Sequence, residues 1–179
     1  MTEAELQQKL FDKLSRYFYV ESEVWSVCHT RRIDLAMFHK SDVAHGYPVG
    51  IEIKTFTKKT GGDVGRWLIQ AQTYSRLEWR NYGKMLILVA PQISGYVFEE
   101  GELTDAGHHE NGRPTPHHNA STFIGQFNVG ELQSYGGVAQ DALFGGEPKR
   151  YRMVYKGSLI WDQRYDEFRI NNYDRLCRQ

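Results

Sequence analysis

The sequence predicts an α/β fold in which helices flank a central mixed β-sheet. An amphipathic helical pattern opens the chain, three runs with strand character follow, and an uninterrupted apolar run comes after a second helical pattern. With 179 residues and 40% hydrophobic content, the chain is long enough to bury one sizeable core. We therefore expect a single domain over residues 1–179, with a regular core in residues 1–91.

The first predicted element is a helix over residues 3–18. Thr2, followed three residues later by Glu5, forms a capping-box pattern that gives this helix a defined start. Apolar side chains recur on one stripe of the helix: Leu6, Leu10, Leu14, Tyr17 and Phe18. This stripe predicts that the helix flanks the sheet.

Three strands are predicted next, with turn residues between them: 20–28, 31–39 and 49–56. Gly61-Gly62-Asp63 then breaks the chain and can cap a second helix over 64–80. Residues 84–90 form a continuous apolar run that Pro91 ends, which is typical of a strand covered on both faces. The predicted order is helix, three strands, helix, strand.

Two loop-rich regions are expected after this core. Residues 92–148 lack periodicity and hold eight acidic residues against one basic residue, which predicts an acidic loop region. Four histidines lie there, without the cysteine partners or helical spacing of well-defined zinc sites: His108, His109, His117 and His118. Residues 149–179 are basic and aromatic and predict a hairpin turning at Lys156-Gly157, then a polar tail. The hairpin could contact phosphates and bases, or it could be a packed hairpin with solvated charges.

Composition limits the setting and the partners. Cys28 and Cys177 lie far apart, which supports neither a disulfide framework nor a thiolate metal cluster. The acidic, polar start is unlike a signal peptide, and no apolar run reaches the length of a membrane span. We therefore expect a soluble cytoplasmic protein with no membrane partner. The 22 basic and 22 acidic residues balance, so no global positive charge indicates a polyanionic partner.

Three charged residues are notable because they lie inside apolar, strand-like runs. Asp34 lies between Ile33 and Leu35, while Glu52 and Lys54 are two residues apart and leave the same face of one strand. Burying an unpaired charge is costly. Two acids and a lysine on one sheet face therefore suggest a site for a hard divalent cation and a water molecule.

These residues, in this element order, resemble the PD-(D/E)XK nuclease superfamily. Asp34 matches its first acid, although Ile33 replaces the signature proline, and Glu52-Ile53-Lys54 matches its second motif. Residues 70–74, Gln-Ala-Gln-Thr-Tyr, match the Q-x-x-x-Y pattern of its RecB-like branch. The likeness covers about residues 3–91. It implies a restriction-endonuclease-like core, with the remaining residues as a C-terminal elaboration.

The resemblance also implies an activity: hydrolysis of phosphodiester bonds, with DNA as the expected substrate. Asp34, Glu52 and the main-chain carbonyl of Ile53 would hold Mg²⁺, for which Mn²⁺ could substitute. Lys54 would orient the attacking water. Gln70 and Tyr74, one turn apart on one helix face, would position the phosphate or the water.

Other interpretations stay open at this stage. Asp34 could pair with Arg31 or Arg32, and Glu52 with Lys54 could form an ion pair on an exposed sheet face. The fold could serve as a non-catalytic nucleic-acid-binding or protein-interaction module, with a protein partner at the acidic loop. RNA as substrate, cutting from ends rather than internally, and association into homo-oligomers are equally open. Glu5 lies where some members of the superfamily have a further acid, but its capping role already explains it.

Overall fold

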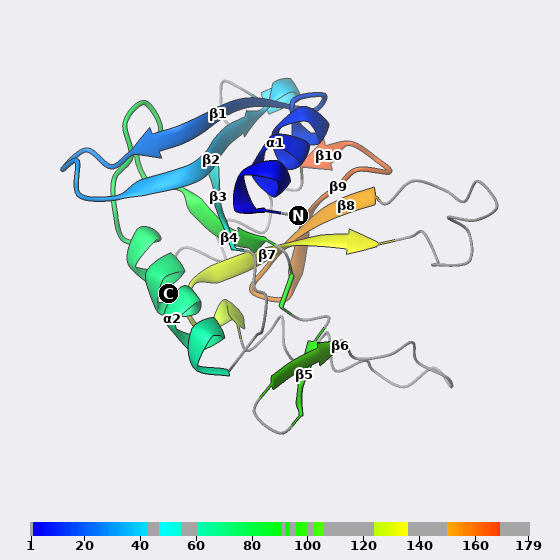
Figure 1. The fold of residues 1–179 in the computed structure, drawn as a ribbon. Helices are drawn as coiled ribbons and strands as arrows, with labels where there is room; N and C mark the ends of the chain where they lie inside the picture. The colour runs from blue at the N-terminus through cyan, green and yellow to red at the C-terminus, as the bar shows by residue number, and fades with distance from the viewer. Residues whose placement is uncertain are drawn as a thin grey trace.

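A mixed eight-stranded β-sheet with a helix on either face organises the computed structural model (Figure 1). The α/β class and the mixed sheet predicted from the sequence are thus confirmed. The structure describes the following residues: 2–42, 47–54, 61–90, 92–93, 96–99, 102–105, 124–135 and 150–168. The four histidines of the acidic region, Cys177 and the polar tail after 168 lie outside these residues.

The first elements follow the predicted order. They are α1 (Glu3–Leu14), β1 (Phe18–Trp25), β2 (Arg32–His39), the short 3₁₀ helix η1 (Lys40–Asp42), β3 (Val49–Ile53), α2 (Gly61–Tyr74) and β4 (Leu86–Ala90). The capping box at the start of α1 is present, since Thr2 and Glu5 bond each other reciprocally.

The helix ends differ from the predicted ones for identifiable reasons. The first helix stops at Leu14 rather than 18, because Phe18 already pairs with His39 in the sheet. The second starts at Gly61 and stops at Tyr74 rather than 80. Its last carbonyl accepts a hydrogen bond from the buried indole nitrogen of Trp79 over 3.3 Å. Residues 55–56, predicted to end the third strand, lie outside the described residues.

The strand order of the sheet is β1-β2-β3-β4-β7-β8-β9-β10. The central strands β3, β4 and β7 are parallel, and the other neighbours are antiparallel. The carboxyl ends of the three parallel strands therefore meet at one edge of the sheet, where polar side chains following a strand can gather.

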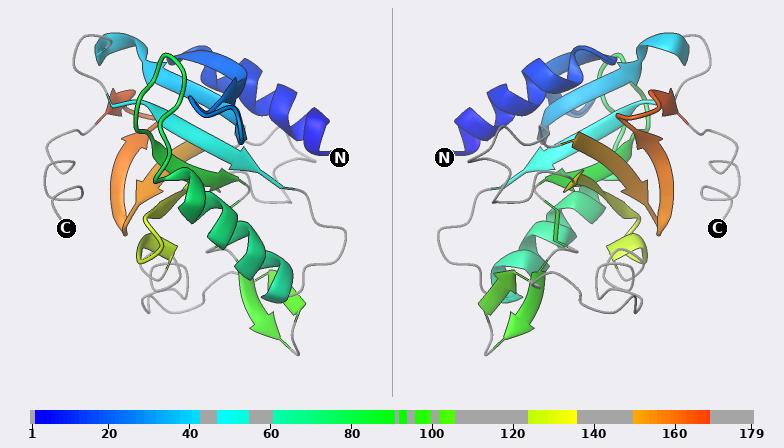
Figure 2. Two further views of the ribbon diagram at one scale, coloured as in Figure 1. Left: turned by 90° about the vertical axis from the view of Figure 1, so that its left-hand side faces the viewer. Right: turned by 90° about the vertical axis from the view of Figure 1, so that its right-hand side faces the viewer.

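Two apolar layers, one on each side of the sheet, form the core, and the helices α1 and α2 lie on opposite sides of the sheet (Figure 2). The stripe of α1, Leu6, Leu10 and Leu14, packs with side chains from one face, including Leu35, Ile51 and Leu88. The apolar side of α2 packs with the opposite face, including Ile33, Ala36, Ile87 and Val89. Side chains of β3 and β4 thus alternate between two covered faces, as the continuous apolar pattern predicts.

In the region 92–148 the sequence predicts loops, but its described residues contain three strands. These are β5 (Tyr96–Glu99), β6 (Glu102–Asp105) and β7 (Val129–Tyr135), of which β7 belongs to the central sheet between β4 and β8. Glu131 and Gln133 of β7 are buried, which interrupts the apolar pattern by which a central strand is recognised. They satisfy each other: Gln133 donates to Glu131 over 3.0 Å, and the backbone amide of Ile93 donates to Glu131 over 2.7 Å.

The predicted C-terminal hairpin is present as β8 (Arg150–Tyr155) and β9 (Ser158–Asp162). Lys156 and Gly157 both have positive φ, as the tight turn between them requires. Trp161 is only 1% exposed and packs edge-on against Phe18, and Tyr155 is buried as well. Neither ring can stack on a base, so this part of the hairpin is a packed structure.

The last strand, β10 (Glu167–Phe168), pairs with β9 at the edge of the sheet. Asp166, in the turn before it, contacts the buried ring of His39, with 2.9 Å between Asp166 Oδ1 and His39 Nε2. The β9–β10 turn therefore lies at the Phe18 end of β1. Among the described residues, no helix combines the length and apolarity that crossing a bilayer requires.

Candidate active site

The strands β2 and β3, which carry Asp34 and Glu52, stop pairing at the candidate site. Pairing of β2 with β3 is regular from Met37 to Leu35, which lies opposite Ile51, and then stops. At the next residue the side-chain alternation of β2 is interrupted, because Ile33 packs with the α2 layer and Leu35 with the α1 layer. There the Asp34 carboxylate replaces the backbone as partner of β3, and its Oδ2 accepts a hydrogen bond from the Ile53 amide over 2.6 Å.

Glu52 is the most buried charged residue of the site, with 2% of its surface exposed. Its Oε1 accepts a hydrogen bond from the amide nitrogen of Gln70 over 2.7 Å. Its Oε2 is also buried and has no hydrogen-bond partner among the described residues. A buried carboxylate oxygen without a partner is costly unless the group is protonated or binds a cation.

Lys54 follows β3 directly and places its ammonium between two acids. The Nζ atom lies 3.0 Å from Glu3 Oε1 and 3.4 Å from Glu52 Oε1. Its side chain is partly exposed, whereas that of Glu52 is nearly closed off from solvent. The sequence left open that Glu52 and Lys54 form an ion pair on an exposed sheet face. Because Glu52 is buried, this interpretation is wrong.

The helix α2 supplies the polar groups on the other side of Glu52. Gln70 and Tyr74 lie four residues apart, so their side chains meet on one face. The Gln70 amide donates both to Glu52 Oε1 and to the Tyr74 hydroxyl, the latter over 2.8 Å. All five side chains singled out in the sequence, Asp34, Glu52, Lys54, Gln70 and Tyr74, thus lie in one cluster.

Electrostatics at the site favour proton uptake by the acids. Burial, reinforced by the negative charge of Asp34, raises the pKa of Glu52 to about 8, and this outweighs the attraction of Lys54. Burial also raises the pKa of Asp34, against the hydrogen bond from Ile53. Burial disfavours the Lys54 ammonium, but its hydrogen bond to Glu3 and the charge of Glu52 raise its pKa overall. Burial and mutual repulsion therefore favour the protonated form of the acids, while the nearby acids favour the charged form of Lys54.

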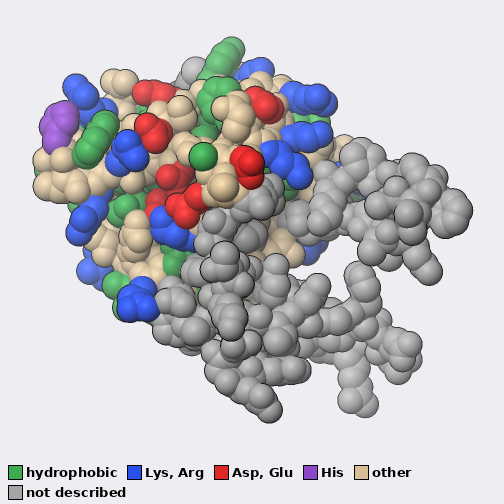
Figure 3. Space-filling view, in the orientation of Figure 1, with side chains coloured by type: hydrophobic (Ala, Val, Ile, Leu, Met, Phe, Trp, Pro, Cys, Tyr) green, Lys and Arg blue, Asp and Glu red, His purple; other side chains and the backbone are tan. Residues whose placement is uncertain are grey.

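Glu3 belongs to the cluster although the sequence does not single it out. The first helix brings this acid, rather than Glu5, to Lys54, while Glu5 is used in the capping box. Figure 3 shows acidic side chains gathered beside a basic one near the start of α1. The contact joins residues 51 positions apart, so a pattern of spacing could not have found it.

A second buried acid lies in the same row of the sheet. Glu52 pairs with Val89 of β4, which pairs in turn with Glu131 of β7. Two strand spacings separate the acids, about 10 Å. Glu131 accepts hydrogen bonds from Ile93 and Gln133, so its place is that of a structural buried acid.

The side chains of the cluster fit a cation bound by two carboxylates and water better than a cation enclosed entirely by protein ligands. In the part of the chain that the structure describes, no three His, Cys, Asp or Glu side chains could together hold a metal. Two acids with an unpartnered buried oxygen, Glu52 Oε2, nevertheless provide hard oxygen ligands of the kind that Mg²⁺ binds together with water. The Ile53 carbonyl, predicted as a further ligand, stays a prediction.

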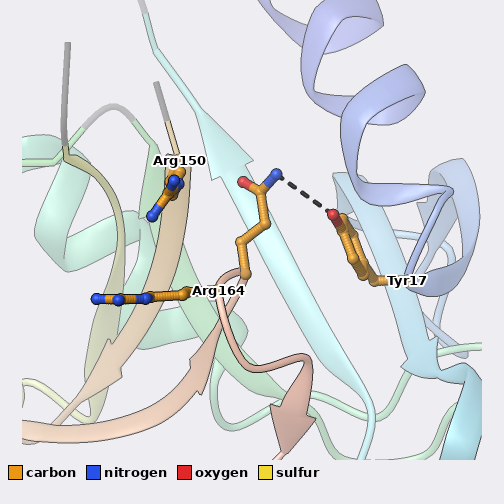
Figure 4. Close-up of a pocket in the computed structure, with 4 residues that line it drawn as sticks. Tyr17, Arg150 and Arg164 are labelled. Carbon is orange, nitrogen blue, oxygen red and sulfur yellow. Dashed lines mark hydrogen bonds between the residues drawn. The ribbon is translucent and has the colours of Figure 1, made fainter. Parts of the chain in front are cut away.

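A pocket of about 540 Å³ lies away from this cluster, where Tyr17, after the end of α1, faces β8 and the turn after β9 (Figure 4). Arg150, Gln163 and Arg164 line it, and Gln163 donates to the Tyr17 hydroxyl over 3.4 Å. No predicted site residue lines this pocket.

Comparisons of the chain with protein-family models, with curated proteins and with solved structures found no match.

Proposed function

We propose that the protein is a Mg²⁺- or Mn²⁺-dependent nuclease that hydrolyses phosphodiester bonds in DNA, built on a restriction-endonuclease-like core. The observation that carries the proposal is the Asp34–Glu52 pair with its unpartnered buried oxygen beside Lys54. The element order α1-β1-β2-β3-α2-β4 supports the fold assignment. Gln70 and Tyr74, bonded to the same cluster, support the RecB-like likeness.

Asp34 and Glu52 would hold the cation, which when bound supplies a nucleophilic water near neutral pH and neutralises charge at phosphorus. The elevated pKa of Lys54 keeps its ammonium charged, so it acts as a donor rather than as a base. It can orient the water through its oxygen or stabilise charge beside the scissile phosphate. Glu3 fixes the position of this ammonium.

Tyr74 is the remaining polar side chain of the cluster. Burial and the charge of Glu52 raise its pKa, so the phenol stays protonated. Because its oxygen already accepts from Gln70, its own proton is available to a phosphate oxygen. Gln70 thereby links the acid that holds the cation to the phenol that holds the substrate.

A non-catalytic binding module is the second candidate. The ion pairs from Lys54 to Glu3 and Glu52 would by themselves pin α1 against the end of β3. In that case the cluster would be structural, and the protein would bind nucleic acid or another protein without cutting.

Incubation with supercoiled plasmid in Mg²⁺ or Mn²⁺ separates the two candidates. We expect the wild type to nick the closed circle and Glu52→Gln to leave it intact. Asp12→Asn, which neutralises an exposed acid on α1, is the matched control and should cut normally. Cutting by Glu52→Gln at the wild-type rate, or no cutting of circular DNA, linear duplex, single strands or RNA by the wild type, would overturn the proposal.

A further inference from the structure

One exposed aromatic side chain lies at the end of β1, close to the acidic cluster. The chain has four tryptophans, of which Trp67, Trp79 and Trp161 are at most 3% exposed. Trp25 is 42% exposed. The ring of His29, in the loop after it, lies at 6.4 Å and tilted by 35°. The β1–β2 loop projects beyond the body of the sheet (Figure 1), and His29 is exposed as well.

One cationic side chain packs on this aromatic pair, and two further exposed arginines lie close by along the backbone. Arg32 lies opposite Trp25 in the sheet, with its guanidinium carbon 5.8 Å from the centre of the indole ring. Arg31 is exposed next to it, and the amide of the exposed Arg80 donates to the Trp25 carbonyl over 3.1 Å. Figure 3 shows a histidine among lysine and arginine side chains at this end of the molecule.

Arg32 is also paired with an acid, but weakly. Its Nη1 lies 3.3 Å from Glu23 Oε2, and about half of each side chain is exposed. Ion pairs this exposed contribute little to stability and are screened by salt. A phosphate could therefore replace Glu23 as the partner of Arg32 at little cost.

Trp25 and Arg32 lie close to the candidate active site. Asp34 follows Arg32 by two residues on β2, a separation of about 7 Å, or roughly two stacked nucleotides of one strand. The charge of Arg32 acts on the Asp34 carboxyl, and that of Arg31 acts on the Tyr74 hydroxyl. A nucleic-acid strand whose scissile phosphate lies at the candidate active site would thus extend over the loop between β1 and β2.

Hydrogen bonds hold the loop between β1 and β2 in place without a ligand. The Ser26 amide donates to the Arg31 carbonyl over 2.8 Å, and the Arg31 amide donates back to the Ser26 hydroxyl over 3.1 Å. The Val27 amide donates to the carbonyl of Glu78, beyond α2, over 2.8 Å. Because the aromatic ring stands on a fixed backbone, little ordering is needed when a ligand binds.

We propose that this surface, formed by Trp25, His29 and Arg32, binds a single-stranded stretch of nucleic acid by stacking one unpaired base on Trp25 and holding a flanking phosphate with Arg32. An exposed indole beside arginines is suited to a base and its phosphates, since every base presents a flat face. The inference rests on the proposed nuclease function for its choice of ligand. It goes beyond that function by assigning the strand state that is recognised.

Tryptophan fluorescence tests this inference without cleavage. In EDTA, single-stranded oligothymidylate should quench the emission of Trp25, the only exposed tryptophan, and shield it from acrylamide. Because both Trp25 variants lack this fluorophore, their affinity is measured from the anisotropy of a dye-labelled oligothymidylate. Trp25→Ala should bind at least about tenfold more weakly, whereas Trp25→Phe should keep most of the affinity. Arg32→Gln should reduce the slope of log affinity against log salt by about 0.7.

Tyr165→Ala is the matched control. This ring is 61% exposed and lies 5.5 Å from the guanidinium carbon of Arg164, but it is in the β9–β10 turn. That turn is at the Phe18 end of β1, seven residues from Trp25 or about 23 Å along the strand. The variant should bind like the wild type.

The outcomes distinguish this inference from the proposed function. Quenching by oligothymidylate, by single-stranded RNA or by both supports base stacking and identifies the source of the base. Equal quenching by blunt duplex, or unchanged affinity of both Trp25 variants, overturns it. Failure of the nuclease proposal would appear instead as an uncut plasmid, with single-strand quenching intact.

Discussion

The Ile53 amide donates to Asp34 Oδ2 over 2.6 Å, at the point where β2 and β3 cease to pair. A side chain of one strand thus takes the place of its backbone as partner of the next. The bond holds the Asp34 carboxylate beside the end of β3, where Glu52 and Lys54 lie, without any cation. The two acids therefore repel each other in the folded chain whenever both are ionised, and several consequences can be measured.

Glu52→Gln should stabilise the protein, and more so at high pH. The pKa of Glu52 rises from 4.5 to about 8 on folding, so the unfolded chain releases this proton at lower pH than the folded chain. Stability is therefore lost as pH rises from about 4.5 to 8. The amide keeps an acceptor for Gln70 and removes the charge. Thermal unfolding at pH 5 and pH 8 should show the larger gain in Tm at pH 8, and an equal gain at both would contradict this.

Mn²⁺ should raise the Tm of the wild type more at pH 8 than at pH 5, in metal-free buffer with added Mn²⁺. Protons and the cation compete for the same carboxylates, and a ligand that binds only the folded state stabilises it by mass action. Asp12→Asn should behave like the wild type. A shift that is independent of pH would place the bound ion elsewhere.

Lys54→Met should separate binding from catalysis. Removing the ammonium removes a donor beside the reacting group, so cleavage of plasmid should fall at least about 100-fold. The acids remain, so the Mn²⁺-induced shift in Tm should persist. The comparison requires both measurements on one preparation. Normal cleavage by this variant would remove Lys54 from the mechanism.

Two glycine substitutions test the fold independently of the site. A methyl group on Gly130 of β7 would lie 2.4 Å from the Val154 carbonyl oxygen, whereas one on Gly65 in α2 would meet nothing within 4 Å. Gly130→Ala should destabilise by about 1–3 kcal/mol. Gly65→Ala should stabilise by up to about 1 kcal/mol, because alanine favours a helix. Urea unfolding measures both, and a neutral Gly130→Ala would contradict the packing of β7 between β4 and β8.

The sequence predicts the first half of the fold well because its signals are local. The capping box at Thr2 and the apolar run ending at Ala90 each depend on neighbours in the chain. It does not predict β7, since Glu131 and Gln133 are buried polar residues whose partners, apart from each other, lie in other segments. A strand whose polar side chains are satisfied by tertiary contacts resembles a loop in sequence.

The same division between local signals and tertiary contacts applies to the candidate site. Spacing predicts that Glu52 and Lys54 share a face, and that Gln70 and Tyr74 meet, because each pair lies on one element. Spacing does not predict that β2 loses its alternation at Asp34, nor that Glu3 reaches Lys54. Both follow from how separate elements pack against each other.

The most direct test of the account is a titration with Mn²⁺ followed by electron paramagnetic resonance of the free ion. We predict one bound Mn²⁺ per wild-type chain, and its loss in both Asp34→Asn and Glu52→Gln, with Asp12→Asn unchanged. If either site variant binds Mn²⁺ with the affinity of the wild type, Asp34 and Glu52 do not share a cation, and the proposed mechanism is wrong.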